Sequence, residues 1–288
     1  MSGYNPLFFA ILHIIMIIDG KAIAQSILTE VKNEIKKLAK APHLTVFTCA
    51  PNFETQKFLD LKQKRATEVG VEVALVSLDP ATITVEIIRM VQEALTTTDG
   101  VIVQLPFPPS VDITSVLSSI PATFDVDALG YLGEKTNVLP PVVGAIDAIA
   151  AAEGVDFSGK KVVVVGQGRL VGAPAALYAQ ARGGTVTILA KDTQDNDHEI
   201  KQADILILGA GVPGLVTAEM VRGGVIVFDA GTSEEGGMLV GDAAVDVAQK
   251  ASLLTPVPGG IGPITIAVLL RNVLQLALLH SKESENVL

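Results

Sequence analysis

The stretch KVVVVGQGRLVGAP, residues 161–174, decides the fold of this chain. Its four consecutive valines have no polar face, which is typical of a central parallel strand covered by helices on both sides. Gly166, Gly168 and Gly172 follow as the chain enters an alanine-rich helix. A glycine-rich turn there predicts a dinucleotide site, because its backbone N–H groups and the helix N-terminus favour phosphate. The spacing G-x-G-x-x-x-G is not the strict G-x-G-x-x-G, so a merely tight turn stays an alternative.

The composition fits a well-packed globular α/β protein, with 49% hydrophobic and 18% charged residues among 288. A net charge of -10 argues against a nucleic-acid partner, since such binding needs a basic surface. The single cysteine excludes an internal disulfide, and the four histidines are widely scattered, so no metal site is expected. These features predict a protein of a reducing, cytoplasmic compartment.

The N-terminal apolar run, residues 6–18, is shorter than the roughly 20 residues that span a bilayer. It has no basic region before it and no small-residue cleavage site after it, which argues against a secretory signal. We therefore expect no membrane association. Residues 1–15 are interpreted as an extension ahead of the domain, and an extra strand or helix packed on the domain stays the alternative.

The rest of the chain alternates apolar strands with helical patterns, which predicts parallel sheets with helical crossovers. Asp19 is placed to cap a first helix. The other expected elements are strands 44–49, 71–78 and 101–105, helices 53–69 and 82–95, a loop-rich crossing 121–143, a helix through Ile146, strands 186–189, 205–208 and 225–228, and a final helix 265–279. The prediction is a two-domain α/β fold, in which a parallel-sheet catalytic domain (1–146) faces a Rossmann-like dinucleotide-binding domain (147–264) across a cleft. The last segment, 265–288, is expected to pack back on the first domain.

Candidate site residues follow the strand ends, where open α/β sheets bind ligands. Thr55, Phe58 and Lys62 are spaced to share one face of a helix. Gln104 ends a strand, and Asp127 lies in the crossing between domains. Lys62 also stands among other basic residues, so a solvated helix face is an alternative reading. The rigid segment PVPGGIGP, residues 256–263, has few side chains and suits close backbone approach to a ligand.

Eight motifs together resemble the bifunctional methylenetetrahydrofolate dehydrogenase/cyclohydrolase family. They are IDGKAIA (18–24), the Thr55–Phe58–Lys62 spacing, DGVIVQLPFP (99–108), DVD (125–127), the glycine-rich turn, ADILILGAGVPG (203–214), VFDAG with GD (227–231, 241–242) and TPVPGGIGPIT (255–265). The resemblance covers roughly residues 16–279, and QLPFP with PGGIGP is its most specific part.

The resemblance implies a role for each matching residue. Lys62 matches the catalytic lysine, Gln104 the glutamine that hydrogen-bonds it, and Asp127 the aspartate that binds the pterin. The implied substrate-binding residues are Thr55, Phe58, Pro258, Gly259, Gly260, Gly262, Pro263 and Thr265. The implied cofactor-binding residues are Gly166, Gln167, Gly168, Arg169, Gly172, Lys191, Gly211 and Pro213.

The chain also departs from the family's pattern. Phe58 stands where the family has a tyrosine, which keeps the stacking face and loses the hydroxyl. Phe124 replaces a basic residue, Ala128 a glycine and Gly168 a serine. The family's P-C-T-P stretch is PPVV here, residues 140–143, so its threonine hydroxyl is absent.

As the resemblance implies, the protein oxidises 5,10-methylenetetrahydrofolate with a nicotinamide cofactor and hydrolyses the methenyl product to 10-formyltetrahydrofolate. Arg169 and Lys191 could meet a 2′-phosphate, which favours NADP, whereas Asp192 could serve a ribose hydroxyl of NAD. The family also implies tetrahydrofolate derivatives as partners and a homodimer. The alternatives are a shikimate-type NAD(P) dehydrogenase and a non-enzymatic folate- or nucleotide-binding homologue.

Overall fold

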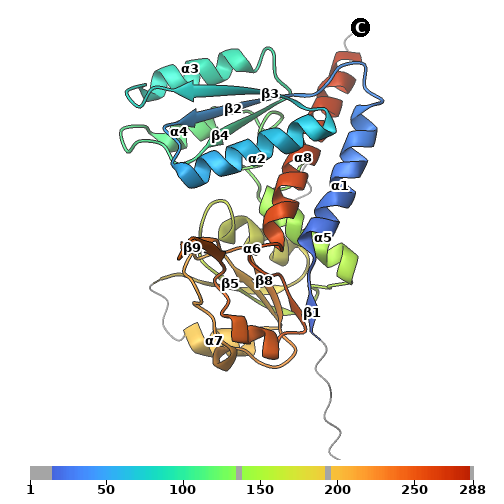
Figure 1. The fold of residues 1–288 in the computed structure, drawn as a ribbon, viewed down its shortest axis with the longest axis vertical. Helices are drawn as coiled ribbons and strands as arrows, with labels where there is room; N and C mark the ends of the chain where they lie inside the picture. Colours follow the sequence, from blue (N-terminus) through green and yellow to red (C-terminus); the bar gives the residue numbers. More distant parts are fainter. Residues whose placement is uncertain (1–14, 134–137, 192–195, 286–288) are drawn as a thin grey trace, which may run out of the picture.

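The computed structural model describes residues 15–133, 138–191 and 196–285. Two parallel sheets are stacked end to end along the long axis and are joined by two long helices and a shorter one (Figure 1). The predicted extension, residues 1–15, lies outside the described residues except for its last position. The predicted fold class of two parallel-sheet units is confirmed.

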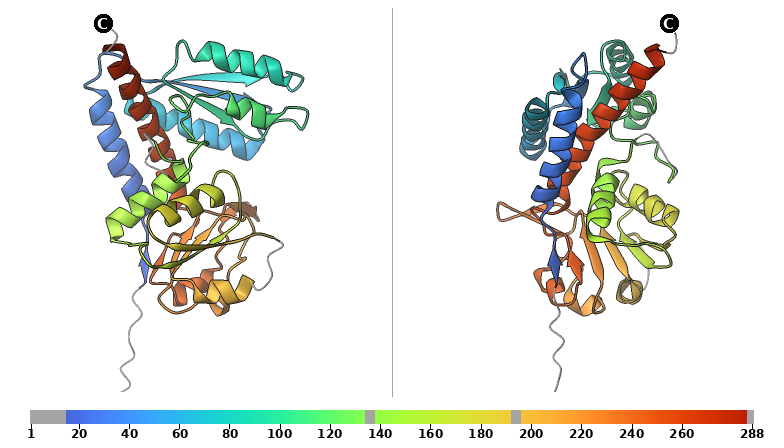
Figure 2. Two further views of the ribbon diagram at one scale, coloured as in Figure 1. Left: turned by 180° about the vertical axis from the view of Figure 1, so that it is seen from behind. Right: turned by 90° about the vertical axis from the view of Figure 1, so that its right-hand side faces the viewer.

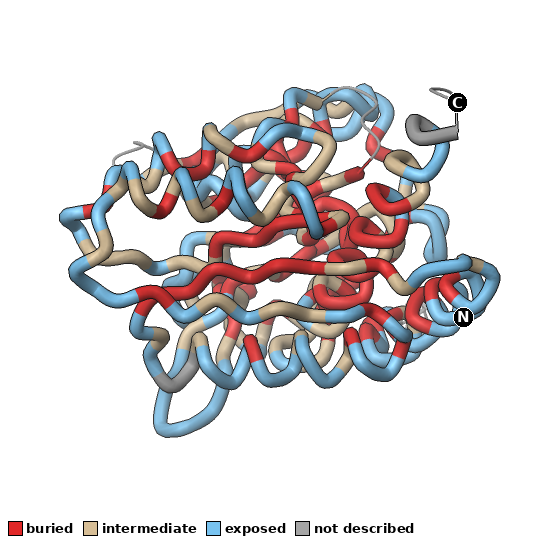
Figure 3. Tube along the Cα trace, turned by 90° about the horizontal axis from the view of Figure 1, so that it is seen from above, coloured by how far each residue is buried: buried red, intermediate tan, exposed pale blue. Residues whose placement is uncertain are grey.

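The first sheet has three parallel strands in the order β3-β2-β4. Its strands are β2 His43–Cys49, β3 Glu72–Leu78 and β4 Gly100–Gln104, and its helices are α2 Phe53–Val69, α3 Thr84–Ala94 and α4 Ile113–Ser118. The central strand β2 is buried along nearly its whole length, whereas the edge strand β3 is largely accessible. Figure 3 shows continuous buried strands at the centre and exposed positions on the outer turns of the helices. The strand predictions agree with these bounds to within one residue.

The second sheet has six parallel strands in the order β1-β11-β8-β7-β5-β6, where the sequence predicted four. Its strands are β1 Met16–Ile17, β5 Lys161–Val165, β6 Thr185–Leu189, β7 Ile205–Leu208, β8 Ile226–Asp229 and β11 Leu253–Leu254. The two strands that the sequence did not predict, β1 and β11, have two residues each, too few to show an alternation. Because β1 pairs with β11, residues 16–17 belong to this sheet, although they fall within the predicted first domain.

The remaining elements of the second half surround this sheet. They are α6 Gly172–Ala181, α7 Asn196–Gln202, the short 3-10 helices Ala218–Met220 and Val245–Gln249, and the hairpin of β9 Ser233–Glu235 with β10 Met238–Val240. The hairpin follows directly after β8, so it stands at the carboxyl edge of the sheet. That is the edge where ligands bind in open α/β sheets.

Helices α1, Gly20–Ile35, and α8, Ile261–Glu285, lie side by side along the first sheet, as Figures 1 and 2 both show. The predicted cap is present, because the Asp19 side chain accepts from the N–H groups of Lys21 and Ala22. Helix α8 begins four residues earlier than predicted. Pro263 does not prevent this, because a proline is tolerated in a first helical turn, where its missing N–H has no partner to lose.

The apolar stretch of α8, Ile261–Lys282, is long and hydrophobic enough to cross a membrane if length and composition are considered alone. Most of it is buried within the fold, with Leu270 and Val273 fully covered. This is the burial expected of a central helix in a packed core.

Helix α5, Pro141–Glu153, carries the chain into the second half. The sequence predicted a loop-rich crossing as far as residue 143, but the helix starts at Pro141 because proline fits the first helical position. The domain boundary predicted between residues 146 and 147 therefore falls inside a continuous helix.

Candidate active site

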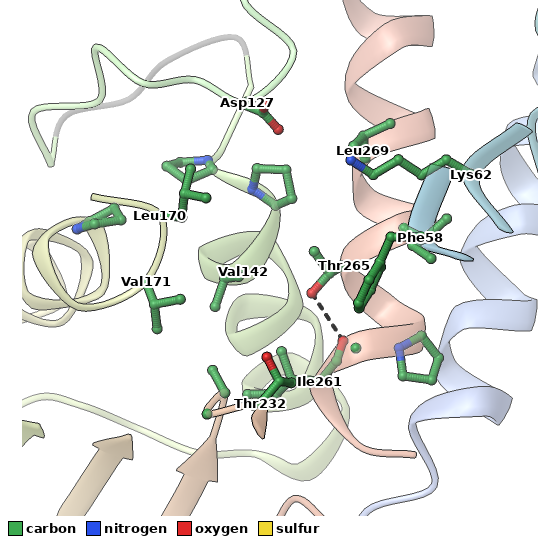
Figure 4. Close-up of a pocket in the computed structure, with 18 of the residues that line it drawn as sticks. Phe58, Lys62, Asp127, Val142, Leu170, Val171, Thr232, Ile261, Thr265 and Leu269 are labelled. Carbon is green, nitrogen blue, oxygen red and sulfur yellow. Dashed lines mark hydrogen bonds between the residues drawn. The ribbon is translucent and has the colours of Figure 1, made fainter. Parts of the chain in front are cut away.

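A cavity of about 960 Å³ lies between the two sheets. Its walls come from α1, α2, α5 and α8, from the glycine-rich turn after β5, and from the segments after β4 and β8. Figure 4 shows side chains from these elements converging on one space. Both halves of the chain thus contribute to a single ligand-sized site.

Lys62 projects from α2 into this cavity (Figure 4). Its Nζ donates a hydrogen bond to Gln104 Oε1 at 2.7 Å, which joins α2 to the carboxyl end of β4. Burial lowers the pKa of the Lys62 amine, and the negative charge of Asp127 partly opposes this. A lysine with a lowered pKa is more easily neutral near physiological pH and can then accept a proton.

Asp127 approaches the same part of the cavity from the opposite wall (Figure 4). Burial raises the pKa of its carboxyl group, and the charge of Lys62 counteracts the increase. The backbone beside it is fixed, because Asn272 of α8 donates from Nδ2 to Val126 O at 2.9 Å. The position of Asp127 is therefore set by the first sheet and by α8 together.

Asp125, the other carboxylate of the DVD triplet, is held by the backbone of its own turn. It is buried, and its Oδ2 accepts from Leu129 N at 2.6 Å. Burial raises its pKa to about 6, with a further contribution from the charge of Asp127. Of the two, Asp127 is the carboxylate that lines the cavity.

The two other residues predicted on α2 have different positions. Phe58 forms part of the cavity wall with 41% of its surface exposed, so its ring face is available to a planar ligand. Thr55 lies in the first turn of α2, where its backbone N–H donates to Asn52 Oδ1 at 2.8 Å. Thr55 is not among the described residues that line the cavity.

Five of the six residues predicted in the segment PGGIGPIT line the cavity: Pro258, Gly259, Gly262, Pro263 and Thr265. Gly260 does not line it and instead allows close packing, since a Cβ there would lie 2.6 Å from Pro256 O. The start of α1 is pressed against the same segment, where Gly20 N donates to Gly259 O at 3.0 Å. Thr265 Oγ1 donates back to Ile261 O within α8 (Figure 4).

The glycine-rich turn has the shape that a dinucleotide requires. Gly166 has a φ of 102°, and a Cβ there would lie 2.6 Å from Gly209 O. A Cβ on Gly172 would lie 2.0 Å from Gly166 O, so the start of α6 is packed against the end of β5. Gly168 has open space beside it, where a phosphate could approach the backbone. The residues of this turn therefore fit a nicotinamide dinucleotide.

The predicted cofactor residues divide into two groups. Gln167 and Arg169 line the cavity, and Arg169 Nη2 also donates to Thr114 Oγ1 across the cleft at 3.4 Å. Lys191, Gly211 and Pro213 are exposed at the carboxyl ends of β6 and β7 and do not line the described cavity. Across the residues that the structure describes, no group of three or more His, Cys, Asp or Glu is placed to hold a metal ion.

Asp229 lines the cavity and lies within the VFDAG motif, but it was not among the predicted site residues. It ends β8, is 3% exposed, and has a pKa that burial raises to about 6. Its place at the carboxyl end of a predicted strand could have identified it, by the same reasoning that selected Gln104.

The departures from the family pattern have local explanations. The ring of Phe124 packs on His280 of α8 with centroids 4.4 Å apart, so an aromatic contact stands where the family has a charge. Ala128 has a φ of 49°, a conformation that favours glycine. Val142 lines the cavity with an apolar side chain.

A lysine–glutamine pair and a dinucleotide turn in one cleft between two parallel-sheet units define a two-domain, dinucleotide-dependent α/β enzyme. Two family models divide the chain in the same way. The catalytic domain of tetrahydrofolate dehydrogenase/cyclohydrolase matches residues 18–127, and the NAD(P)-binding domain of the same family matches residues 140–281. The chain belongs to the tetrahydrofolate dehydrogenase/cyclohydrolase family.

Individual relatives agree with this assignment. A curated bifunctional protein FolD from Halothermothrix orenii is 37% identical, covering 92% of this chain and 98% of the relative. The crystal structure of the bifunctional FolD enzyme from Campylobacter jejuni has a TM-score of 0.89 at 32% identity and covers 93% of this chain and 100% of its own. The Trypanosoma brucei enzyme, solved with NADP cofactor and inhibitor, has a TM-score of 0.87 at 32% identity, with 93% and 98% covered. These matches confirm the family predicted from the motifs and do not support a shikimate-type enzyme.

Proposed function

We propose that this protein oxidises 5,10-methylenetetrahydrofolate with NADP and hydrolyses the resulting 5,10-methenyl cation to 10-formyltetrahydrofolate. Its close relatives are bifunctional dehydrogenase/cyclohydrolase enzymes, one of them solved with NADP. The observation that carries the proposal is the Lys62–Gln104 hydrogen bond inside a cavity that Gln167 and Arg169 of the dinucleotide turn also line.

The cofactor, when bound, accepts a hydride from the methylene carbon of the folate. We propose that Gln167, Arg169 and the backbone at Gly168 hold its phosphates, with Gly166 and Gly172 shaping the turn. The chain's contribution to this first reaction is mainly positioning, since both reactants must meet in one cleft.

The folate is held from the other side of the cavity. In this proposal Asp127 accepts hydrogen bonds from the pterin N–H groups, and Phe58 stacks on the ring. The segment that contains Pro258, Gly259 and Gly262 covers the site with backbone rather than bulky side chains.

The second reaction needs a proton acceptor. Water adds to the methenyl carbon, and the neutral Lys62 amine takes the proton that the water loses. The bond from that carbon to N5 then breaks as the new hydroxyl loses its proton to become the formyl oxygen and N5 gains a proton, which gives the 10-formyl product. Gln104 keeps the Lys62 amine directed into the cavity, because its Oε1 accepts a hydrogen bond from Nζ.

A paired spectroscopic assay tests the function. Purified protein receives 5,10-methylenetetrahydrofolate with NADP or with NAD, while reduced cofactor and the methenyl intermediate are followed separately. Reduced cofactor with formyl product above the uncatalysed rate is the expected result. The absence of reduced cofactor with either nucleotide would contradict the dehydrogenase assignment and favour a non-enzymatic binding protein.

The role of Lys62 is tested by Lys62→Ala, with Lys64→Ala on an exposed position of the same helix as the control. We expect Lys62→Ala to lower cyclohydrolase activity by about 100-fold or more, the range of a lost general base, while NADP still binds. Activity equal to that of the control variant would remove Lys62 from the mechanism.

The partners and location proposed for this enzyme are tetrahydrofolate derivatives, a second copy of the chain, and the cytoplasm, with no nucleic-acid or membrane partner. The net charge of -10 argues against a nucleic-acid partner, and the burial of most of α8 argues against a membrane partner. For the homodimer we propose an interface on the second sheet, at its edge strand β6. The other edge of that sheet is β1. Sedimentation of the purified chain at twice the monomer mass is the expected result.

A further inference from the structure

Two buried carboxylates lie at the carboxyl edge of the second sheet: Asp229, which borders the cavity, and Asp242, which does not line it. Asp242 is fully buried, and Asp229 is 3% exposed. Their packing is so close that a Cβ on Gly231 would lie 2.2 Å from the Asp242 carboxyl, and one on Gly241 would lie 2.1 Å from Asp229 Oδ2. Burying a carboxylate costs free energy unless hydrogen bonds satisfy it. The hydrogen-bond partners of these two side chains therefore show which backbone segments they fix.

The Asp242 side chain accepts hydrogen bonds from three backbone N–H groups of one loop. Its Oδ2 accepts from Ala210 N at 2.6 Å and Gly211 N at 3.1 Å, and its Oδ1 accepts from Val212 N at 2.8 Å. This loop, residues 209–214, follows the end of β7. Three consecutive N–H groups turned towards one carboxylate fix the path of the loop.

Asp229 in turn holds Asp242. Its Oδ1 accepts from Asp242 N at 3.2 Å, and its Oδ2 accepts from Ala243 N at 2.9 Å. The backbone N–H of Asp229 donates to Thr255 Oγ1 at 2.6 Å, and Thr255 begins the segment that covers the folate side of the cavity. The chain of contacts therefore runs from the folate segment through both carboxylates to the loop after β7.

The loop held by Asp242 abuts the dinucleotide turn. A Cβ on Gly166 would lie 2.6 Å from Gly209 O, and one on Gly209 would lie 2.3 Å from a methyl group of Val171. In the sheet order, β7 lies on one side of β5 and β6 on the other. The ribose of the adenosine half binds at the end of the second strand of such a sheet, here β6, which leaves the β7 side for the nicotinamide half.

We infer that Asp229 and Asp242 are positioning residues that hold loop 209–214 in the shape that receives the nicotinamide half of the cofactor. This inference rests on the proposed function. Neither carboxylate needs to touch a reacting atom, because both act through the backbone that they fix.

The test is Asp242→Asn, which keeps the size of the side chain. It replaces one carboxylate oxygen with an NH2 group, which cannot accept from the loop N–H groups that it faces. We expect its Kd for NADP to rise by about 10-fold or more. The Kd for adenosine 2′,5′-bisphosphate, which lacks the nicotinamide half, and the KM for methylenetetrahydrofolate should change less than about threefold. The control is Asp246→Asn, the same substitution at a carboxylate away from the cavity that also accepts from a backbone N–H group, that of Ala218.

Ser233→Ala covers the case in which Asp242→Asn does not fold. Ser233 Oγ donates to Gly211 O at 3.0 Å from the accessible side of the same loop, and we expect a smaller rise in the NADP Kd of about threefold. An NADP Kd within twofold of wild type in folded Asp242→Asn, or an equal loss for NADP and the bisphosphate, would overturn the inference. Failure of the wild-type enzyme to bind NADP would instead reject the proposed function.

Discussion

Lys62 and Gln104 are joined by a hydrogen bond of 2.7 Å from Nζ to Oε1, although 42 positions separate them in the sequence. The contact ties the middle of α2 to the last residue of β4, so a crossover helix and a strand end of the same sheet meet in the cavity. Gln104 Nε2 also donates to Leu105 O, which orients its amide with the oxygen towards the lysine. An uncharged acceptor holds the amine without stabilising its charged form as strongly as a carboxylate would.

Gln104→Glu tests this relationship. A carboxylate at the same position favours the protonated amine, so the pKa of Lys62 rises and less neutral amine is present at a given pH. We expect the ascending limb of the cyclohydrolase rate–pH profile, which reports the base, to move to higher pH by about one unit or more. Gln63→Glu, at an exposed position of α2, is the control and should leave the profile unchanged. A profile for Gln104→Glu that coincides with wild type would mean that Lys62 is not the titrating base.

Phe58→Tyr tests what the missing hydroxyl does. Residue 58 lies four positions before Lys62, so a hydroxyl there reaches the neighbourhood of the amine. We expect hydrolysis of the methenyl intermediate to accelerate by about tenfold, with hydride transfer changed less than about threefold, because the hydroxyl assists only the proton transfers. The measurement is the height of the transient methenyl signal, which should fall. Phe107→Tyr, outside the cavity, is the control, and a methenyl signal unchanged by Phe58→Tyr would show that the hydroxyl is dispensable.

Asn272→Ala tests how α8 supports the site. Asn272 is 1% exposed, and its Nδ2 donates to Val126 O at 2.9 Å and Leu139 O at 2.7 Å. Removing the amide takes the donor away from one buried and one half-buried carbonyl, so we expect the free energy of unfolding to fall by about 3 kcal/mol. The KM for the folate should also rise, because Val126 precedes Asp127. Urea unfolding measures the first effect, and Gln275→Ala on the exposed face of α8 should change stability by less than about 0.5 kcal/mol.

The parts of the fold that the sequence predicted are those with a repeated local signal. Strand β5 is a run of valines, and the ends of β2, β3, β4 and β5 agree with the predicted ranges because each strand is an apolar run bounded by turn residues. Strands β1 and β11 have two residues each and are defined by pairing with distant partners, so no local pattern reveals them. Helices α5 and α8 start earlier than predicted because their first turns, which contain Pro141 and Pro263, have little apolar periodicity.

In the candidate site, too, some features have a local sequence signal and others depend on distant contacts. Lys62, Gln104 and Asp127, which the strand-end rule and the motifs selected, line the same cavity. The position of Thr55 outside the cavity depends on where α2 begins, which its cap at Asn52 determines. The Asp229–Asp242 contact joins residues on either side of a hairpin, and it depends on glycines that let the two segments approach. Such tertiary packing is not encoded in any single stretch.

The pH dependence of stability gives a further test, through Asp125. Burial raises its pKa to about 6 in the folded protein, above the ordinary value of 3.8. The folded state therefore binds this proton more tightly than the unfolded chain, so the contribution to stability is present at low pH and is lost as the pH rises through about 6. From about pH 4.5 to about pH 7.5 the loss amounts to about 2 kcal/mol.

Asp125→Asn removes this titration, so it isolates the contribution of Asp125. Urea unfolding of wild type and variant should show their difference in unfolding free energy moving in favour of the variant by about 2 kcal/mol between those two pH values. Asp112→Asn is the contrasting control, because hydrogen bonds from Ser115 lower the pKa of Asp112 and its titration cannot reduce stability as the pH rises. Parallel curves for wild type and Asp125→Asn would show that Asp125 remains ionised in the folded protein, with its bond to Leu129 N outweighing the cost of burial.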